Sequence, residues 1–143
     1  MPFRWSAQAT RTTSSVALSA LLLASAAKHF RTPSFYNQVV PDYLCRKDEA
    51  GASNGPLAVM SREEWIASSG LLEAAAAVGL LVPGTRKAAA NATTAMFIAF
   101  LAGHIDALRR AYGPEGSEKA RRVHTVRLPL QLPLILWSWS LRK

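Results

Sequence analysis

Two long apolar segments joined by a five-residue turn are the feature that most constrains this chain. Ile66 to Val82 carries Glu73 as its only charge, and Ala88 to Leu108 stays apolar until His104 and Asp106. Both segments are close to the ~20 residues that the hydrocarbon core of a bilayer requires. In the intervening turn, "PGTRK", proline and glycine end one helix and the two basic residues suit the headgroup region. The pattern predicts a tight transmembrane helical hairpin.

A further apolar segment lies on each side of this hairpin. Residues 14–30 are apolar or small except at their last turn, and residues 126–141 form an apolar stretch that contains two prolines and two tryptophans. The two tryptophans, Trp137 and Trp139, are typical of an interfacial belt. None of the four segments has the polar face at helical period that a water-exposed helix needs. We therefore predict an all-α fold, with residues 1–143 forming one four-transmembrane-helix bundle whose first interhelical loop is long.

Charge supports the same interpretation. Lys and Arg outnumber Asp and Glu by 17 to 9, which in a soluble protein would suggest a nucleic-acid partner. Here the basic residues fall mainly at the edges of the apolar segments, as Arg109 and Arg110 do, so we expect a lipid bilayer and no nucleic acid. The terminal side of the predicted bundle holds six Lys and Arg and the long-loop side holds eleven, which favours long loops in the cytoplasm. The single cysteine, Cys45, permits no internal disulfide and no CxxC pair.

Two alternatives remain open at this point. The first segment, preceded by Arg4 and Arg11 and containing small residues around Ala27 that would fit a cleavage site, also resembles a cleavable signal peptide or an organellar transit peptide. The whole chain could instead be a soluble four-helix bundle with a Trp-rich last helix.

The loops differ in character. The first, 31–65, opens with "RTPSFYNQVVPDYL", whose aromatic residues and prolines suit a segment lying at the membrane interface, and continues as a Gly/Ser/Asn-rich surface insertion. Residues 109–127 are polar and basic, and we expect them to form the second loop on that side.

Several of these stretches, in order, resemble the DoxX-like family of small four-helix bacterial membrane proteins. They are "KHFRTPSFYNQVVPDYL", "SGLLEAAAAVGLLVPGTRKAAA", "AGHIDAL" and "RLPLQLPLILW", and together with the segments between them they span about four fifths of the chain. His104 stands where an asparagine is common in that family. The resemblance implies a multi-pass protein of the bacterial inner membrane, in a family linked by name to a quinone-dependent oxidoreductase although most members have no assigned activity.

A four-span topology brings together the polar residues at the long-loop ends of the helices. Intramembrane ionisable groups usually face a bundle interior or a wet cavity, which makes them a candidate site. Glu73, ~10 Å inside its span at the helical rise, is expected to accept a bond from Arg127 or Ser69. Asp106 is expected to pair with nearby arginines, and the histidines could instead be bonded to backbone. The candidate cluster is His29, Glu73, His104, Asp106, Arg127 and Gln131.

No HxxxH or ExxH spacing indicates a metal site, no nucleotide or haem motif indicates a cofactor, and no catalytic residue is assigned. The sequence favours a non-catalytic accessory or interaction subunit that binds a membrane protein partner or another copy of itself. The alternative is a redox subunit with a quinone, a lipid or another apolar ligand between its helices and a buried carboxyl that handles a proton. A transporter would require an oligomer.

Overall fold

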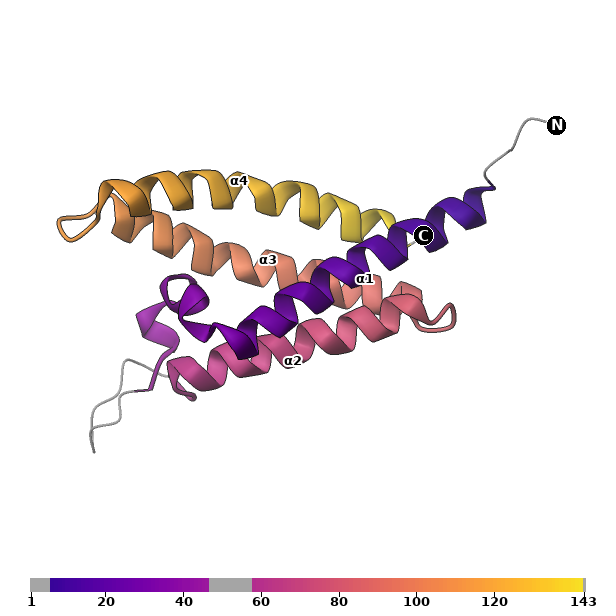
Figure 1. The fold of residues 1–143 in the computed structure, drawn as a ribbon, viewed down its shortest axis with the longest axis horizontal. Coiled ribbons are helices and arrows are strands. Elements are labelled where there is room, and N and C mark those ends of the chain that lie inside the picture. The colour runs from indigo at the N-terminus through magenta and orange to yellow at the C-terminus, as the bar shows by residue number, and fades with distance from the viewer. Residues whose placement is uncertain (1–5, 47–57, 143) are drawn as a thin grey trace.

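The computed structural model describes residues 6–46 and 58–142, and the chain is helical throughout this part apart from its turns and loops. The long helices are arranged as two pairs, with a short irregular segment between the pairs at one end (Figure 1). The long helices are α1 (Ala7–Arg31), α2 (Arg62–Leu81), α3 (Arg86–Ala111) and α4 (Glu118–Ser140). The connection after α1 contains two 3₁₀ helices, η1 (Pro33–Val39) and η2 (Asp42–Leu44).

Serine side chains start three of the four helices. The Ser6 hydroxyl accepts a hydrogen bond from the Ala9 amide at 3.0 Å, and Ser117 does the same for Ala120 at 3.0 Å. At the start of α2, Ser61 and Glu64 form a reciprocal capping box. Each cap satisfies amide groups that the first helical turn leaves without a partner.

Small residues let the helices approach closely. A Cβ added at Gly70 of α2 would lie 2.8 Å from the Cβ of His29 on α1, and one added at Gly79 would lie 2.7 Å from the Cβ of Ala89 on α3. The buried Ser19 hydroxyl of α1 donates to the Ala77 carbonyl of α2 at 2.7 Å. The contacts at Gly79 and Ser19, with the packing of α3 against α4, hold the terminal-side half of the bundle around one apolar core.

The two helical pairs diverge toward the other end, and η1 lies between them, in contact with α1, α2 and α3 (Figure 1). Gly103 of α3 makes this docking possible, because a Cβ there would lie 2.0 Å from the Val39 carbonyl oxygen. Arginine side chains bind the same segment: Arg110 donates to the Gln38 carbonyl, and Arg62 donates to the carbonyls of Asn37 and Val40. The opening of the first loop is thus packed into the bundle end.

The structure corrects the second predicted loop. Residues 109–111 and 118–127, expected to be loop, are helical, and the connection between α3 and α4 is confined to 112–117. The cap at Ser117 and the i,i+4 pair of Arg122 with Glu118, 2.6 Å apart, stabilise the first turns of α4 although these carry no apolar stripe. Pro129 therefore lies well inside a helix. The Gly/Ser-rich part of the first loop, 47–57, falls outside the described residues.

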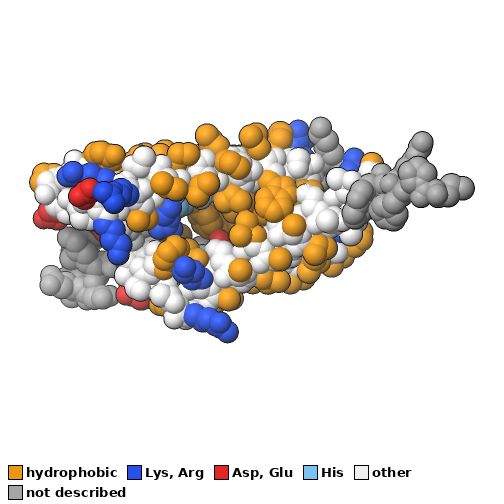
Figure 2. Space-filling model, turned by 45° about the horizontal axis from the view of Figure 1, so that its top comes forward, with side chains coloured by type: hydrophobic (Ala, Val, Ile, Leu, Met, Phe, Trp, Pro, Cys, Tyr) orange, Lys and Arg blue, Asp and Glu red, His pale blue; other side chains and the backbone are white. Residues whose placement is uncertain are grey.

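Within the described ranges, two helices, α2 and α3, are long and apolar enough to cross a membrane. In α1 and α4 the apolar stretch is shorter than the helix, because α1 begins with "AQATRTT" and α4 with "EKARRVHT". Figure 2 shows apolar side chains over much of the visible helix surface and most of the charged side chains gathered toward one end.

Candidate functional site

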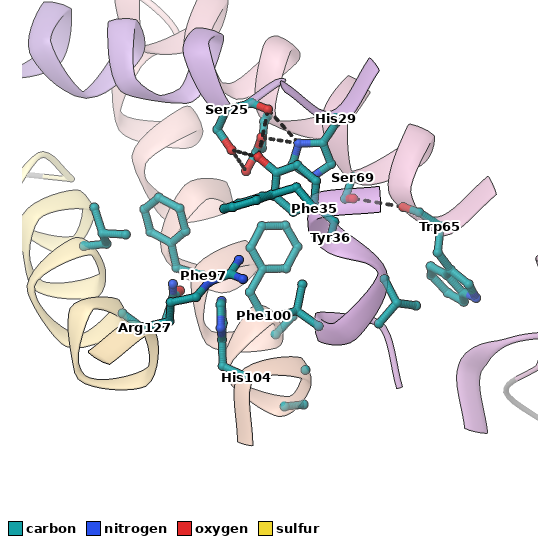
Figure 3. Close-up of a pocket in the computed structure, with 18 of the residues that line it drawn as sticks. Ser25, His29, Phe35, Tyr36, Trp65, Ser69, Phe97, Phe100, His104 and Arg127 are labelled. Atoms are coloured by element: carbon teal, nitrogen blue, oxygen red, sulfur yellow. Dashed lines mark hydrogen bonds and ion pairs between the residues drawn. The ribbon is translucent and has the colours of Figure 1, made fainter. Parts of the chain in front are cut away.

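A cavity of about 420 Å³ lies between the two helical pairs, where they diverge. Its walls come from all four long helices and from the connection after α1, and they are mostly apolar. Aromatic rings contribute much of this surface, and Figure 3 shows them around the space: Phe35, Tyr36, Trp65, Phe97 and Phe100. Its volume falls within the range of pockets that bind small molecules, about 300–1,000 Å³.

Five of the six predicted site residues line this cavity: His29, Glu73, His104, Arg127 and Gln131. Asp106 does not. Its carboxylate accepts from Arg109 at 3.1 Å and from Arg110 at 2.8 Å, so it forms the local ion pairs expected of it and lies apart from the cavity wall. Among the described residues, no group of three His, Cys, Asp or Glu side chains is placed to hold a metal ion.

One polar wall is built on α1, α2 and η1. The Ser25 hydroxyl donates to Glu73 Oε1 at 3.2 Å, and Glu73 Oε2 lies 3.3 Å from His29 Nδ1. His29 Nδ1 is only 2.7 Å from the Ser25 carbonyl oxygen, so its proton is shared first with the backbone and Glu73 Oε2 has no hydrogen-bond partner. The Tyr36 ring stacks on His29 with centroids 3.6 Å apart, and burial raises the pKa of the Tyr36 hydroxyl.

This wall corrects the expected partners of Glu73. Neither Arg127 nor Ser69 contacts its carboxylate; the Ser69 hydroxyl instead donates to the carbonyls of Trp65 and Ile66 on its own helix. Ser25 takes that place because it lies four residues before His29, one turn away on the same face of α1. The carboxylate, 4% exposed, is therefore held by α1 and not by α4.

The opposite polar wall consists of His104 on α3 and of Arg127 and Gln131 on α4. His104 and Gln131 are 7% and 9% exposed, and the described residues offer no hydrogen-bond partner to His104 Nδ1 or Gln131 Oε1. The Arg127 guanidinium is half-buried and lies 4.6 Å from the centre of the Phe35 ring. In Figure 3, Arg127 and His104 lie on the same side of the cavity, across from Ser25 and His29.

Sequence reasoning missed Ser25, Tyr36 and His124. Ser25 carried a usable signal in its spacing from His29, whereas nothing in the sequence places Tyr36 against α1. His124 is buried next to the cavity end, 2.6 Å from the Gln38 side-chain oxygen. Burial and the positive charges of Arg127 and Arg110 lower the pKa of His124.

The cavity opens sideways between α1 and α4. Leu21 of α1 and Leu130 of α4 line it and are also 44% and 55% exposed, so they form its rim. Figure 2 shows the opening as a hollow between the two helical layers, with apolar side chains around it. At the far end of the helices a hydrogen bond of 2.8 Å from the Trp137 indole to the Ser14 hydroxyl closes the gap between α1 and α4.

Comparison with known proteins gives a family and no activity. Residues 18–142 match a family model described as a domain of unknown function, DUF8561. The chain belongs to the DUF8561 family. The matched range includes every residue of both polar walls. No curated protein and no solved structure matches the chain.

Proposed function

We propose that this DUF8561 member is a four-span integral membrane protein of DoxX-like architecture in the bacterial inner membrane. In this proposal it is an accessory subunit without a catalytic centre of its own, and it binds a small apolar molecule between its helical pairs. The laterally open, mostly apolar cavity with two polar walls is the observation that carries the proposal.

The outer surface of the helices supports four spans. Large apolar side chains are exposed along α1 and α4 as well as along α2 and α3. Examples are Val16 (48%) on α1, Leu71 (63%) on α2, Ile98 (53%) on α3 and Leu136 (67%) on α4. Exposed apolar surface of this extent is unfavourable in water and favourable against lipid chains.

The position of the cavity supports uptake from the bilayer. Its rim residues, Leu21 and Leu130, lie in the predicted first and fourth spans, where lipid chains would surround them. A ligand dissolved in the membrane could then enter between α1 and α4 without crossing water.

The first experiment tests the membrane assignment. Carbonate extraction of membranes should leave the protein in the pellet, and its release into the supernatant would contradict the proposal. Purification in detergent followed by mass spectrometry of extracted small molecules should then reveal a bound apolar compound.

A matched pair of variants tests the cavity. Leu134→Trp should fill the space and abolish co-purification of the compound, because Leu134 lines the cavity. Leu132→Trp adds the same ring on the outer surface, where Leu132 is 57% exposed, and should leave binding unchanged. Equal binding by both variants would show that the ligand does not occupy this cavity.

A quinone is the second candidate ligand. The aromatic lining suits a planar ring, and the Glu73–His29 pair provides a carboxylate and an imidazole beside the cavity that could accept or donate a proton. Finding a quinone in the extract would favour this redox alternative, whereas a co-purifying membrane protein or a homo-oligomer with no small molecule would favour an interaction subunit.

A further inference from the structure

Two cations meet at one aromatic ring on the rim of the cavity. The Lys28 ammonium lies 3.6 Å from the centre of the Phe35 ring, and the Arg127 guanidinium lies 4.6 Å from it. Lys28 comes from α1 and Arg127 from α4, so the cations approach the ring from the two helices that border the opening. Gathering two positive charges around one ring is unfavourable unless a negative group lies near both.

The described residues supply no such negative group. No carboxylate in this part of the chain lies within 4 Å of either cation, and the two buried carboxylates have other contacts. Glu73 lies on the opposite wall, where it accepts from Ser25 and lies 3.3 Å from His29, and Asp106 is paired with two other arginines. The cation–π contact with Phe35 offsets only part of the desolvation of a half-buried guanidinium.

Polar groups without partners extend from Arg127 into the cavity. His104 Nδ1 and Gln131 Oε1 are buried, and Gln131 follows Arg127 by four residues, so both lie on one face of α4. Buried polar atoms without partners are uncommon in folded proteins and require an explanation. An anionic head with several oxygen atoms can accept from His104 in the tautomer that is protonated at Nδ1, and from the Gln131 side-chain NH₂ group once the amide is turned to face it. The same head compensates the two cations.

We propose that the ligand is an amphiphile with one apolar chain and one anionic oxygen head, either a carboxylate or a phosphate monoester. Its head pairs with Arg127 and Lys28 beside Phe35, and its chain lies in the apolar cavity toward Phe97 and Leu22. This inference rests on the proposed function, because it names the chemical class of the molecule held in that cavity.

The test compares matched ligands on protein purified in detergent and stripped of bound lipid. Radiolabelled hexadecanoate and hexadecyl phosphate carry the charged heads, and methyl hexadecanoate carries the same chain without a charge. The expected result is that the wild type binds at least one charged ligand about tenfold to a hundredfold more tightly than the ester, the range expected for a charge-assisted contact. The stronger of the two charged ligands distinguishes a carboxylate head from a phosphate head.

Substitutions of the two cations test which residue is responsible for the preference for a charged head. Arg127→Gln should remove most of the preference for charge and leave ester binding unchanged, while Arg127→Lys should retain part of it. Arg122→Gln serves as the control, because Arg122 lies on the same helix, 79% exposed, and is paired with Glu118 outside the cavity. If Arg127→Gln does not fold, Lys28→Gln at the exposed end of α1 provides the same comparison with a smaller expected loss.

The outcomes separate this inference from the proposed function. Equal binding of ester and charged ligands by the wild type, or equal weakening of both by Arg127→Gln, would overturn the anionic head and leave an apolar-ligand protein. Binding of none of the three ligands by a folded protein would overturn both the inference and the binding part of the proposed function.

Discussion

Gly103 provides the sharpest test of how the cavity end is built. In Gly103→Ala the new methyl group would meet the Val39 carbonyl oxygen at 2.0 Å, far inside van der Waals contact. Alanine in a helix interior normally stabilises by about 1 kcal/mol relative to glycine. Overpacking a tight contact costs about 1–3 kcal/mol. The clash is with backbone, so no side-chain rotation can relieve it, and we expect a net loss of up to about 2 kcal/mol in place of a gain.

The matched control is Gly84→Ala in the turn between α2 and α3. A Cβ at Gly84 meets nothing within 4 Å and its backbone is not in the left-handed region, so this variant should be neutral or gain about 0.4–1 kcal/mol. Stability would be measured as the denaturant midpoint in detergent micelles, followed by circular dichroism. Gly103→Ala should unfold before the wild type and Gly84→Ala should not. A Gly103→Ala midpoint at or above that of the wild type would refute the docking of η1 on α3.

Three further predictions follow from the site. Glu73→Gln should change the free energy of unfolding by at most about 1 kcal/mol, because its amide oxygen can still accept from Ser25, whereas Glu73→Ala should cost about 2 kcal/mol or more; equal stability of the two variants would contradict this role. The pKa of His124 is lower in the folded protein than its unfolded value of about 6.5, so its contribution to stability is complete above pH 6.5 and is lost as the pH falls toward the folded pKa. When the pH is lowered below 6.5, the denaturant midpoint of the wild type should therefore decrease by more than that of His124→Gln. Identical pH profiles of the two proteins would contradict this prediction. With the long loops in the cytoplasm, a reporter fused after Lys143 that is active only in the cytoplasm should stay inactive, and activity there would reverse the orientation.

The hairpin of α2 and α3 was predictable because its apolar segments have nearly the length of the helices and its turn contains Pro83 and Gly84. The first turns of α4 were not predictable from apolar periodicity, since a capping serine and one i,i+4 ion pair start that helix. A search for apolar stretches finds the part of a helix that can lie in a membrane. It does not find polar turns at the ends of the same helix, such as the first turns of α4.

The sequence predicted which residues gather at the site but not which of them contact one another. Topology placed five of the six polar residues around one cavity, because they lie at the same ends of the helices. The partner of Glu73 depends on the rotation of α1 about its axis, and Gly70 permits the observed rotation by letting the His29 side chain pack against α2. Periodicity gives the face of one helix but not its rotation against a neighbour, so Ser25 and Arg127 could not be distinguished as partners beforehand.

The divergence of the two helical pairs gives the molecule a wedge shape, narrow where Gly79 lies against Ala89 and wide where η1 separates the pairs (Figure 1). In a bilayer, a wedge displaces more lipid area from one leaflet than from the other. In the proposed four-span arrangement, this shape would favour a curved membrane, with the wide end in the convex leaflet. Lipids next to the narrow end would need to occupy the area that the protein leaves free there. Lipids with large headgroups and lipids with small headgroups should therefore be enriched at opposite ends of the protein.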